Sequence, residues 1–139
     1  PAPAWSARNR GAPEAEFTAR AHVFAEARRN VLCISYRWTY QGEDQEGLIV
    51  AGVNTERSAA EATWVDSWHM ADSFMLCRGP FETGAPFSVL GSYAAPPGPD
   101  WGWQTTLEMQ DANRWRLVMD NIPPDSEGQL AFEIDFSRA

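Results

Sequence analysis

The sequence predicts an all-β fold, an up-and-down antiparallel meander of eight to ten strands closed into a barrel. From Glu16 onward apolar and polar residues alternate, which is the period of a half-buried strand. Turn-forming residues interrupt this alternation at short and regular intervals, as in a series of hairpins. A content of 12% aromatic residues, seven of them tryptophan, also favours strands.

The clearest strand covers residues 31–41, where alternate positions carry Leu32, Ile34, Tyr36, Trp38 and Tyr40. We expect this apolar face to point inward. The other predicted strands are 15–25, 46–54, 60–69, 73–82, 87–94, 101–110, 114–122 and 129–138. The short turns between them favour an up-and-down barrel over a two-sheet sandwich. A barrel of eight strands leaves room for packed side chains or for one small ligand.

At 139 residues the chain fits one domain. Residues 1–14 are rich in proline and small residues, so we expect an irregular N-terminal segment there and a single barrel domain over 15–139. Residues 94–100 contain three further prolines and are expected to form a rigid surface loop.

The charge and cysteine content exclude several classes of function. A net charge of −8 argues against nucleic-acid and membrane partners, because both require a basic patch. All eleven basic residues are arginine, so Schiff-base chemistry on lysine is excluded. Cys33 and Cys77 lack CxxC spacing, and no signal peptide or membrane span is apparent. We therefore expect two reduced, buried thiols in a cytoplasmic protein.

The most distinctive stretch is 63–70, with the sequence TWVDSWHM. In an extended strand Trp64, Asp66 and Trp68 share one face, and His69 lies on the other. A buried carboxylate requires a partner. A tight corner at 69–72 would bring Arg78 near Asp66. Two interpretations follow: an internal contact of Asp66 with Arg78 or Asn121 fixes the barrel register, or Asp66 is a polar anchor that faces a ligand.

Eight aromatic side chains are expected to face the interior, where they either fill it or line a flat apolar cavity. They are Tyr36, Trp38, Tyr40, Trp64, Trp68, Tyr93, Trp103 and Trp115. The few polar groups among them would be Asp66, Arg78, Thr105 and Asn121. We expect the interior to open between the corner at 69–72 and the loop at 96–100. The candidate ligand-binding residues are Tyr36, Trp38, Trp64, Asp66, Trp68, Arg78, Tyr93, Trp103 and Asn121.

The sequence contains no pattern typical of a catalytic or metal centre. His22 and His69 are the only histidines, and they lack the spacing of metal ligands. Ser67 and His69 are two residues apart on one strand, where a serine and its base seldom hydrogen-bond. No nucleophile elbow, phosphate-binding loop or dinucleotide fingerprint is present. We therefore predict no catalytic residues, no metal and no cofactor.

Four stretches carry a resemblance to a known family. They are 64–69 (WVDSWH), 91–93 (GSY), 97–103 (PGPDWGW) and 115–123 (WRLVMDNIP). The chain resembles the bacterial domain-of-unknown-function 1579 family over roughly residues 15–138. The resemblance implies a calycin-like barrel, related in shape to lipocalins and fatty-acid-binding proteins. Haem-binding calycins carry an axial histidine late in the chain, whereas here no histidine follows His69.

Three functional hypotheses follow. In the first, the protein binds a small hydrophobic or amphipathic molecule inside its aromatic-lined barrel. In the second, it is an enzyme that uses Asp66 as a general base, a role that burial favours and that pairing with Arg78 opposes. In the third, it is a ligand-free structural or protein-interaction domain whose sheet surface contacts another subunit, as in a homodimer.

Overall fold

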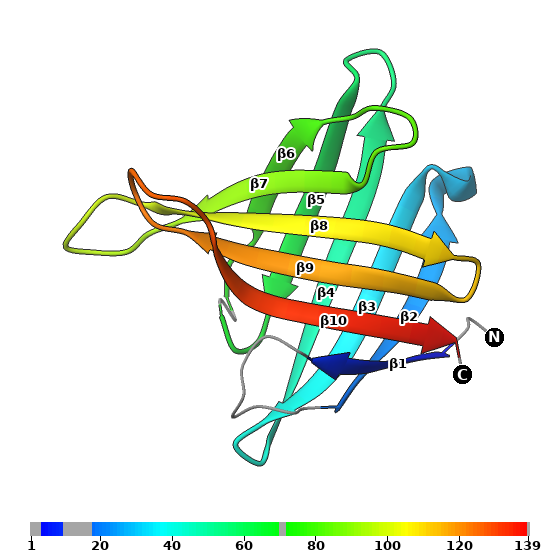
Figure 1. The fold of residues 1–139 in the computed structure, drawn as a ribbon, viewed down its shortest axis with the longest axis horizontal. Helices are drawn as coiled ribbons and strands as arrows, with labels where there is room; N and C mark the ends of the chain where they lie inside the picture. Colours follow the sequence, from blue (N-terminus) through cyan, green and yellow to red (C-terminus); the bar gives the residue numbers. More distant parts are fainter. Residues whose placement is uncertain (1–3, 10–17, 70–71, 139) are drawn as a thin grey trace.

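The protein is an antiparallel β-barrel, shown in Figure 1. The computed structural model describes residues 4–9, 18–69 and 72–138. Within them are ten strands and one short 3-10 helix, η1 (Ala27–Arg29). The strands are β1 (Ala4–Asn9), β2 (Thr18–Glu26), β3 (Val31–Tyr40), β4 (Glu43–Asn54), β5 (Ala59–Asp66), β6 (Met75–Pro80), β7 (Phe87–Tyr93), β8 (Trp101–Asp111), β9 (Arg114–Ile122) and β10 (Gln129–Arg138).

Each strand pairs with the strands before and after it in sequence, and β1 pairs with β10 to close the barrel. The predicted meander and its closure are thereby confirmed. Figure 1 shows the hairpin connections at the two ends of the barrel in alternation. The pairing of β6 with β7 is the sparsest, with one paired position, Arg78 opposite Leu90.

Strand β1 corrects the prediction of an irregular N-terminal segment. Residues 4–9 form a regular strand between β2 and β10, with Trp5 opposite both Ala21 and Arg138. The local composition gave no strand signal, because this strand is specified by its two neighbours in space. A tryptophan in a proline-rich lead-in predicts that Trp5 covers a barrel mouth. Its side chain lies outside the described residues.

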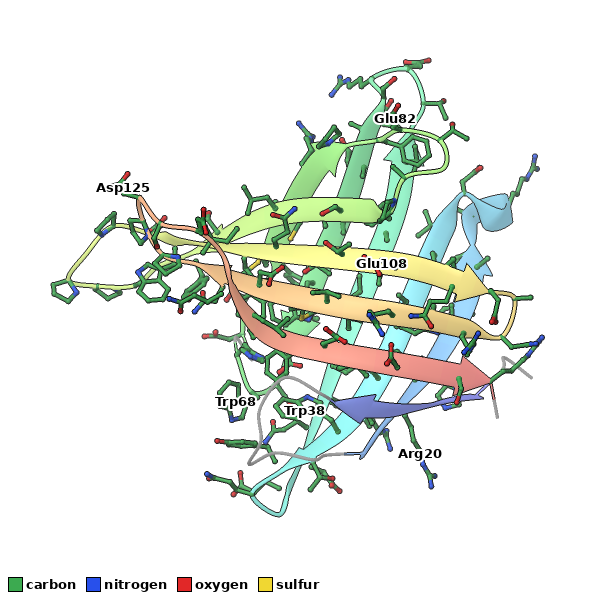
Figure 2. The ribbon with its side chains drawn as sticks, in the orientation of Figure 1. Arg20, Trp38, Trp68, Glu82, Glu108 and Asp125 are labelled. Carbon is green, nitrogen blue, oxygen red and sulfur yellow. The ribbon has the colours of Figure 1, made fainter. Side chains whose placement is uncertain are left out.

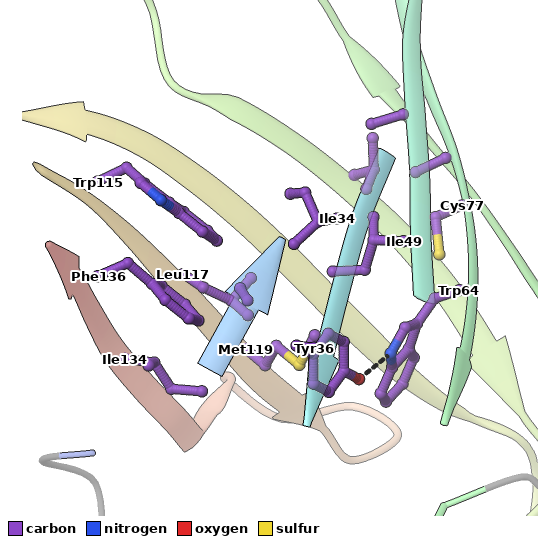
Figure 3. Close-up of a cluster of buried hydrophobic side chains, with 14 of the residues drawn as sticks. Ile34, Tyr36, Ile49, Trp64, Cys77, Trp115, Leu117, Met119, Ile134 and Phe136 are labelled. Carbon is purple, nitrogen blue, oxygen red and sulfur yellow. Dashed lines mark hydrogen bonds between the residues drawn. The ribbon is translucent and has the colours of Figure 1, made fainter. Parts of the chain in front are cut away.

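The core is built from inward-facing side chains of every strand from β2 to β10. On β3 Ile34, Tyr36 and Trp38 are buried as predicted, whereas Leu32 is 38% exposed and Cys33, on the opposite face, is buried. Figure 3 shows Trp115 lying flat on Phe136, with ring centroids 4.0 Å apart at an interplanar angle of 6°. Side chains thus fill the body of the barrel, and the free space lies towards its ends.

Among the described residues there is no helix with the length and apolarity needed to cross a membrane.

Candidate functional site

Asp66 is the last residue of β5, and its side chain is 2% exposed. Two donors from β3 reach one of its carboxylate oxygens. Tyr36 Oη donates to Oδ2 at 2.7 Å, and Trp38 Nε1 donates to the same atom at 3.3 Å. Trp64 Nε1 in turn donates to Tyr36 Oη at 2.7 Å, the bond drawn in Figure 3. The buried carboxylate is therefore held by a chain of aromatic donors.

The other carboxylate oxygen, Oδ1, shapes the turn that follows β5. It accepts hydrogen bonds from the backbone N–H of Trp68 at 2.8 Å and of His69 at 3.3 Å. These bonds make an Asx-type turn, in which an aspartate caps amides two and three residues ahead. His69 Nδ1 also lies 3.1 Å from Oδ1. The turn therefore returns the His69 ring to the carboxylate that starts it.

This turn corrects the predicted faces at 64–69. Trp64 and Asp66 both face inward, but the strand ends at Asp66, so the alternation does not continue. Trp68 is 48% exposed at the rim, where it contacts Trp38 at a centroid distance of 6.0 Å. Figure 2 shows these two tryptophans together at one end of the barrel. His69, predicted to face away from Asp66, lies against it instead.

The network keeps Asp66 ionised. Burial alone would raise the pKa of Asp66, but the hydrogen bonds from His69, Tyr36 and the Trp68 amide outweigh it and lower that pKa below its ordinary value. Burial and the adjacent charge of Asp66 raise the pKa of Tyr36 well above its ordinary value. Tyr36 therefore remains a phenol and a permanent donor to the carboxylate.

Aromatic rings enclose His69. Its ring centroid lies 4.5 Å from that of Trp68, 5.3 Å from that of Trp64 and 5.4 Å from that of Trp103. Trp64 and Trp103 are stacked on each other, with centroids 5.3 Å apart and an interplanar angle of 14°. The imidazole is thus held in place by the surrounding rings and by Asp66 at Nδ1.

A cavity of about 370 Å³ lies beside this cluster. Its walls are almost entirely apolar, and its polar members are His69, Tyr93 and Asn121, with the indole of Trp103. The lining consists of Trp64, Trp68, His69, Met75, Tyr93, Trp103, Asn121, Ala131 and Phe132. A second hollow of about 20 Å³, about the size of one water molecule, lies deeper against Tyr36, Trp38, Asp66 and His69.

Comparison with known protein families identifies the family of this chain. A family model described as "Protein of unknown function (DUF1579)" matches residues 4–138. The chain belongs to the DUF1579 family. This assignment confirms the resemblance carried by the tryptophan-rich stretches and includes all the residues of the cavity. No curated protein matches the sequence.

In this DUF1579 barrel most of the predicted site residues converge, but they divide between the two hollows. Trp64, Trp68, Tyr93, Trp103 and Asn121 line the larger one. Tyr36, Trp38 and Asp66 lie against the smaller one. Two rings of the predicted cluster line neither hollow: Trp115 lies on Phe136, and Tyr40 packs against Trp68. Thr105 lines neither hollow.

Arg78 does not belong to the site. The predicted corner would place Trp64 opposite Arg78, whereas Trp64 is opposite Met75 and Arg78 is opposite Glu61. The register of β5 with β6 therefore differs from the predicted one by an odd number of residues. Because side chains alternate, such a shift reverses the face of every residue on β6. The Arg78 side chain is 67% exposed and pairs with Glu61 at 2.9 Å.

The predicted contact of Asp66 with Asn121 is also wrong. The hydrogen-bond partners of Asp66 are Tyr36, Trp38, Trp68 and His69. Asn121 instead accepts a hydrogen bond at Oδ1 from Tyr93 Oη, at 2.6 Å. Nor do residues of the loop at 96–100 line the cavity; Ala131 and Phe132 of β10 do so in their place.

Sequence reasoning missed His69 as an interior residue. The signal that would have found it is the order Asp-Ser-Trp-His. An aspartate can accept hydrogen bonds from the amides two and three residues after it, which favours a turn over a continuing strand. Among the described residues, no group of three or more histidine, cysteine, aspartate or glutamate side chains is placed to hold a metal ion.

Proposed function

We propose that this protein binds a small hydrophobic or amphipathic molecule in the cavity beside His69. The observation that carries the proposal is the cavity itself: about 370 Å³ of space, walled by tryptophan, phenylalanine and methionine and supplied with a few convergent polar groups. Small-molecule sites occupy about 300–1,000 Å³ and combine apolar walls with few polar anchors. The calycin-like relationship implied by the family resemblance agrees with this function.

A wider hollow of about 1150 Å³ lies elsewhere on the barrel, lined largely by aliphatic side chains such as Val23, Val31 and Leu107. Of its polar residues, Asn30, Thr55 and Gln110 are exposed to solvent and Glu108 is half-buried. It has no counterpart to the buried pair of Asp66 and His69 among the described residues that line it. We therefore assign the ligand to the cavity beside His69.

Catalysis by Asp66 as a general base has less support. Both carboxylate oxygens are occupied by donors, and the pKa of this carboxyl is lowered rather than raised towards neutrality. The cavity argues against the third hypothesis, a ligand-free interaction domain. We place the protein in the cytoplasm because both cysteines, Cys33 and Cys77, are free and buried.

The test is a titration of the protein's tryptophan fluorescence with fatty acids, flavins, tetrapyrroles and aromatic metabolites. At least one class should give saturable quenching, because Trp64, Trp68 and Trp103 line the cavity. Trp68→Ala should weaken this binding at little cost in stability, since Trp68 is half-exposed. Phe74→Ala is the matched control, because Phe74 is an exposed ring outside the lining. Absence of saturable binding in every class would refute the proposal.

A further inference from the structure

One residue that lines the cavity beside His69, Trp103, carries a buried donor that no described residue satisfies. Trp103 lines the cavity and is 6% exposed, and its Nε1 has no hydrogen-bond partner within the described part of the chain. An indole N–H can only donate. Leaving such a group unpaired costs about 1–3 kcal/mol, so a ligand acceptor placed there would recover part of this free energy.

Asn121 supplies a second donor. Tyr93 Oη donates to Asn121 Oδ1 at 2.6 Å, which occupies the acceptor end of the amide. The amide group Nδ2 keeps two N–H donors, and none of the described residues accepts a hydrogen bond from it. Tyr93 and Asn121 both line the cavity. The hydrogen bond between them therefore leaves the Nδ2 end of the Asn121 amide for a ligand.

His69 supplies the third polar group. Its Nδ1 lies 3.1 Å from the ionised Asp66, so Nδ1 carries a hydrogen and Nε2 is the ring atom left for a ligand. A proton added at Nε2 would give an imidazolium whose charge Asp66 balances.

The charged surroundings of His69 are simple. Of the described residues that line the two hollows beside it, Asp66 alone carries charge. The other titratable groups there are the phenols of Tyr36 and Tyr93, while Tyr40 lies behind Trp68 with ring centroids 5.3 Å apart. The oxygens of Asp66 face its own donors. An imidazolium at His69 would therefore be the only cation among the described residues of the lining.

We propose that the ligand is a small organic acid with an apolar body, bound as its carboxylate. This inference rests on the proposed function. The carboxylate oxygens would accept hydrogen bonds from Trp103 Nε1, Asn121 Nδ2 and a protonated His69 Nε2, and the apolar body would lie against Met75 and Phe132. The protons balance in one way: where His69 is neutral before the carboxylate binds, one proton is taken up at Nε2 from the buffer for each ligand bound.

The experiment compares naphthoate and decanoate with their primary amides by isothermal titration calorimetry, at about pH 6 and at about pH 8. At least one acid should bind about tenfold or more tightly than its amide at the lower pH, the expected effect of a charge-assisted hydrogen bond. The advantage should shrink at the higher pH. The acid that binds more tightly shows whether the cavity prefers a ring-shaped apolar body, as in naphthoate, or a chain, as in decanoate.

Four variants sharpen the test. His69→Gln should abolish the pH dependence, whereas His22→Gln, which changes the other, exposed histidine on β2, should leave it intact. Asn121→Asp should weaken binding of the acid more than Asn121→Ala, because a second carboxylate would face the ligand.

A measurement on the unmodified protein guards against variants that fail to fold. Titrations at about pH 8 in two buffers of different ionisation enthalpy should show uptake of roughly one proton per acid bound. Equal binding of acid and amide, or binding without proton uptake, would overturn this inference and leave the proposed function standing. If neither these compounds nor the wider panel binds, the proposed function itself fails.

Discussion

Tyr36 on β3 and Asp66 on β5 hydrogen-bond at 2.7 Å although strand β4 lies between them. The residue between them is Gly47, which is opposite Tyr36 on one side and opposite Asp66 on the other. Because Gly47 has no side chain, the phenol crosses over β4 and reaches the carboxylate. A Cβ at this position would overlap the ring of Tyr36.

We therefore expect Gly47→Ala to displace Tyr36 and to lower the free energy of unfolding by about 2–5 kcal/mol, from overpacking and from the lost bond to a buried charge. Gly52→Ala on the same strand is the control, because its Cβ would meet only the carbonyl oxygen of Asn30, at 3.4 Å. That change should alter stability by less than about 1 kcal/mol. Equal effects of the two substitutions on the free energy of unfolding in urea would contradict the position of the Tyr36 ring over Gly47.

Asp66→Asn should cost about 3 kcal/mol at neutral pH, since an amide group would confront hydroxyl and indole donors that now meet a carboxylate. The pKa of Asp66 is lower in the folded protein than in the unfolded chain, where an aspartate has a pKa of about 3.9. The ionised carboxylate therefore contributes fully to stability above the unfolded pKa, and this contribution is lost as the pH falls through the folded pKa. The stability difference between wild type and variant should therefore narrow below about pH 4. Denaturant unfolding at several pH values measures it, and a difference that stayed constant down to pH 3 would argue against this role.

Arg78→Ala should change stability by less than about 1 kcal/mol, because the pair with Glu61 is exposed on both sides. Ligand affinity should not change. Arg116 provides the comparison: it makes two bonds to Asp135, at 2.7 Å and 3.2 Å, in a half-buried position on the outer surface. Arg116→Ala should cost more, about 1–2 kcal/mol. The reverse order in thermal unfolding would mean that Arg78 has a role the structure does not show.

The two thiols should resist modification in the folded protein. Cys33 and Cys77 are both buried, and burial raises the pKa of Cys77 to about 11. A thiol reagent at about pH 8 should label neither cysteine until denaturant is added. Rapid labelling of Cys77 in the native state would indicate that the sparse pairing of β6 with β7 opens readily.

The fold was predictable because its determinants are local. Alternation on β3 and the turns between strands establish a meander without any information on distant contacts. Strand β1 was not predictable in this way, since its residues become a strand through pairing with β2 and β10. Its propensity alone is too weak to show it.

The site was predictable in composition but not in geometry. Inward placement of Trp64 and Asp66 follows from alternation, whereas the register across the turn after β5 depends on how that turn folds. Asp66 itself determines the turn by capping Trp68 and His69, and one such bend decides which of Arg78 and His69 meets the carboxylate. A pattern of alternating faces carries no information on that choice.

The pairing of β1 with β10 has a consequence for how the barrel assembles. Every other neighbouring pair is a hairpin, but the closing pair joins residues such as Trp5 and Arg138 from opposite ends of the described chain. Loop-closure entropy increases with sequence separation, so the hairpins should form first and the seam last. Until then β1 and β10 are bare sheet edges, which makes the unclosed intermediate the species most exposed to strand-to-strand aggregation.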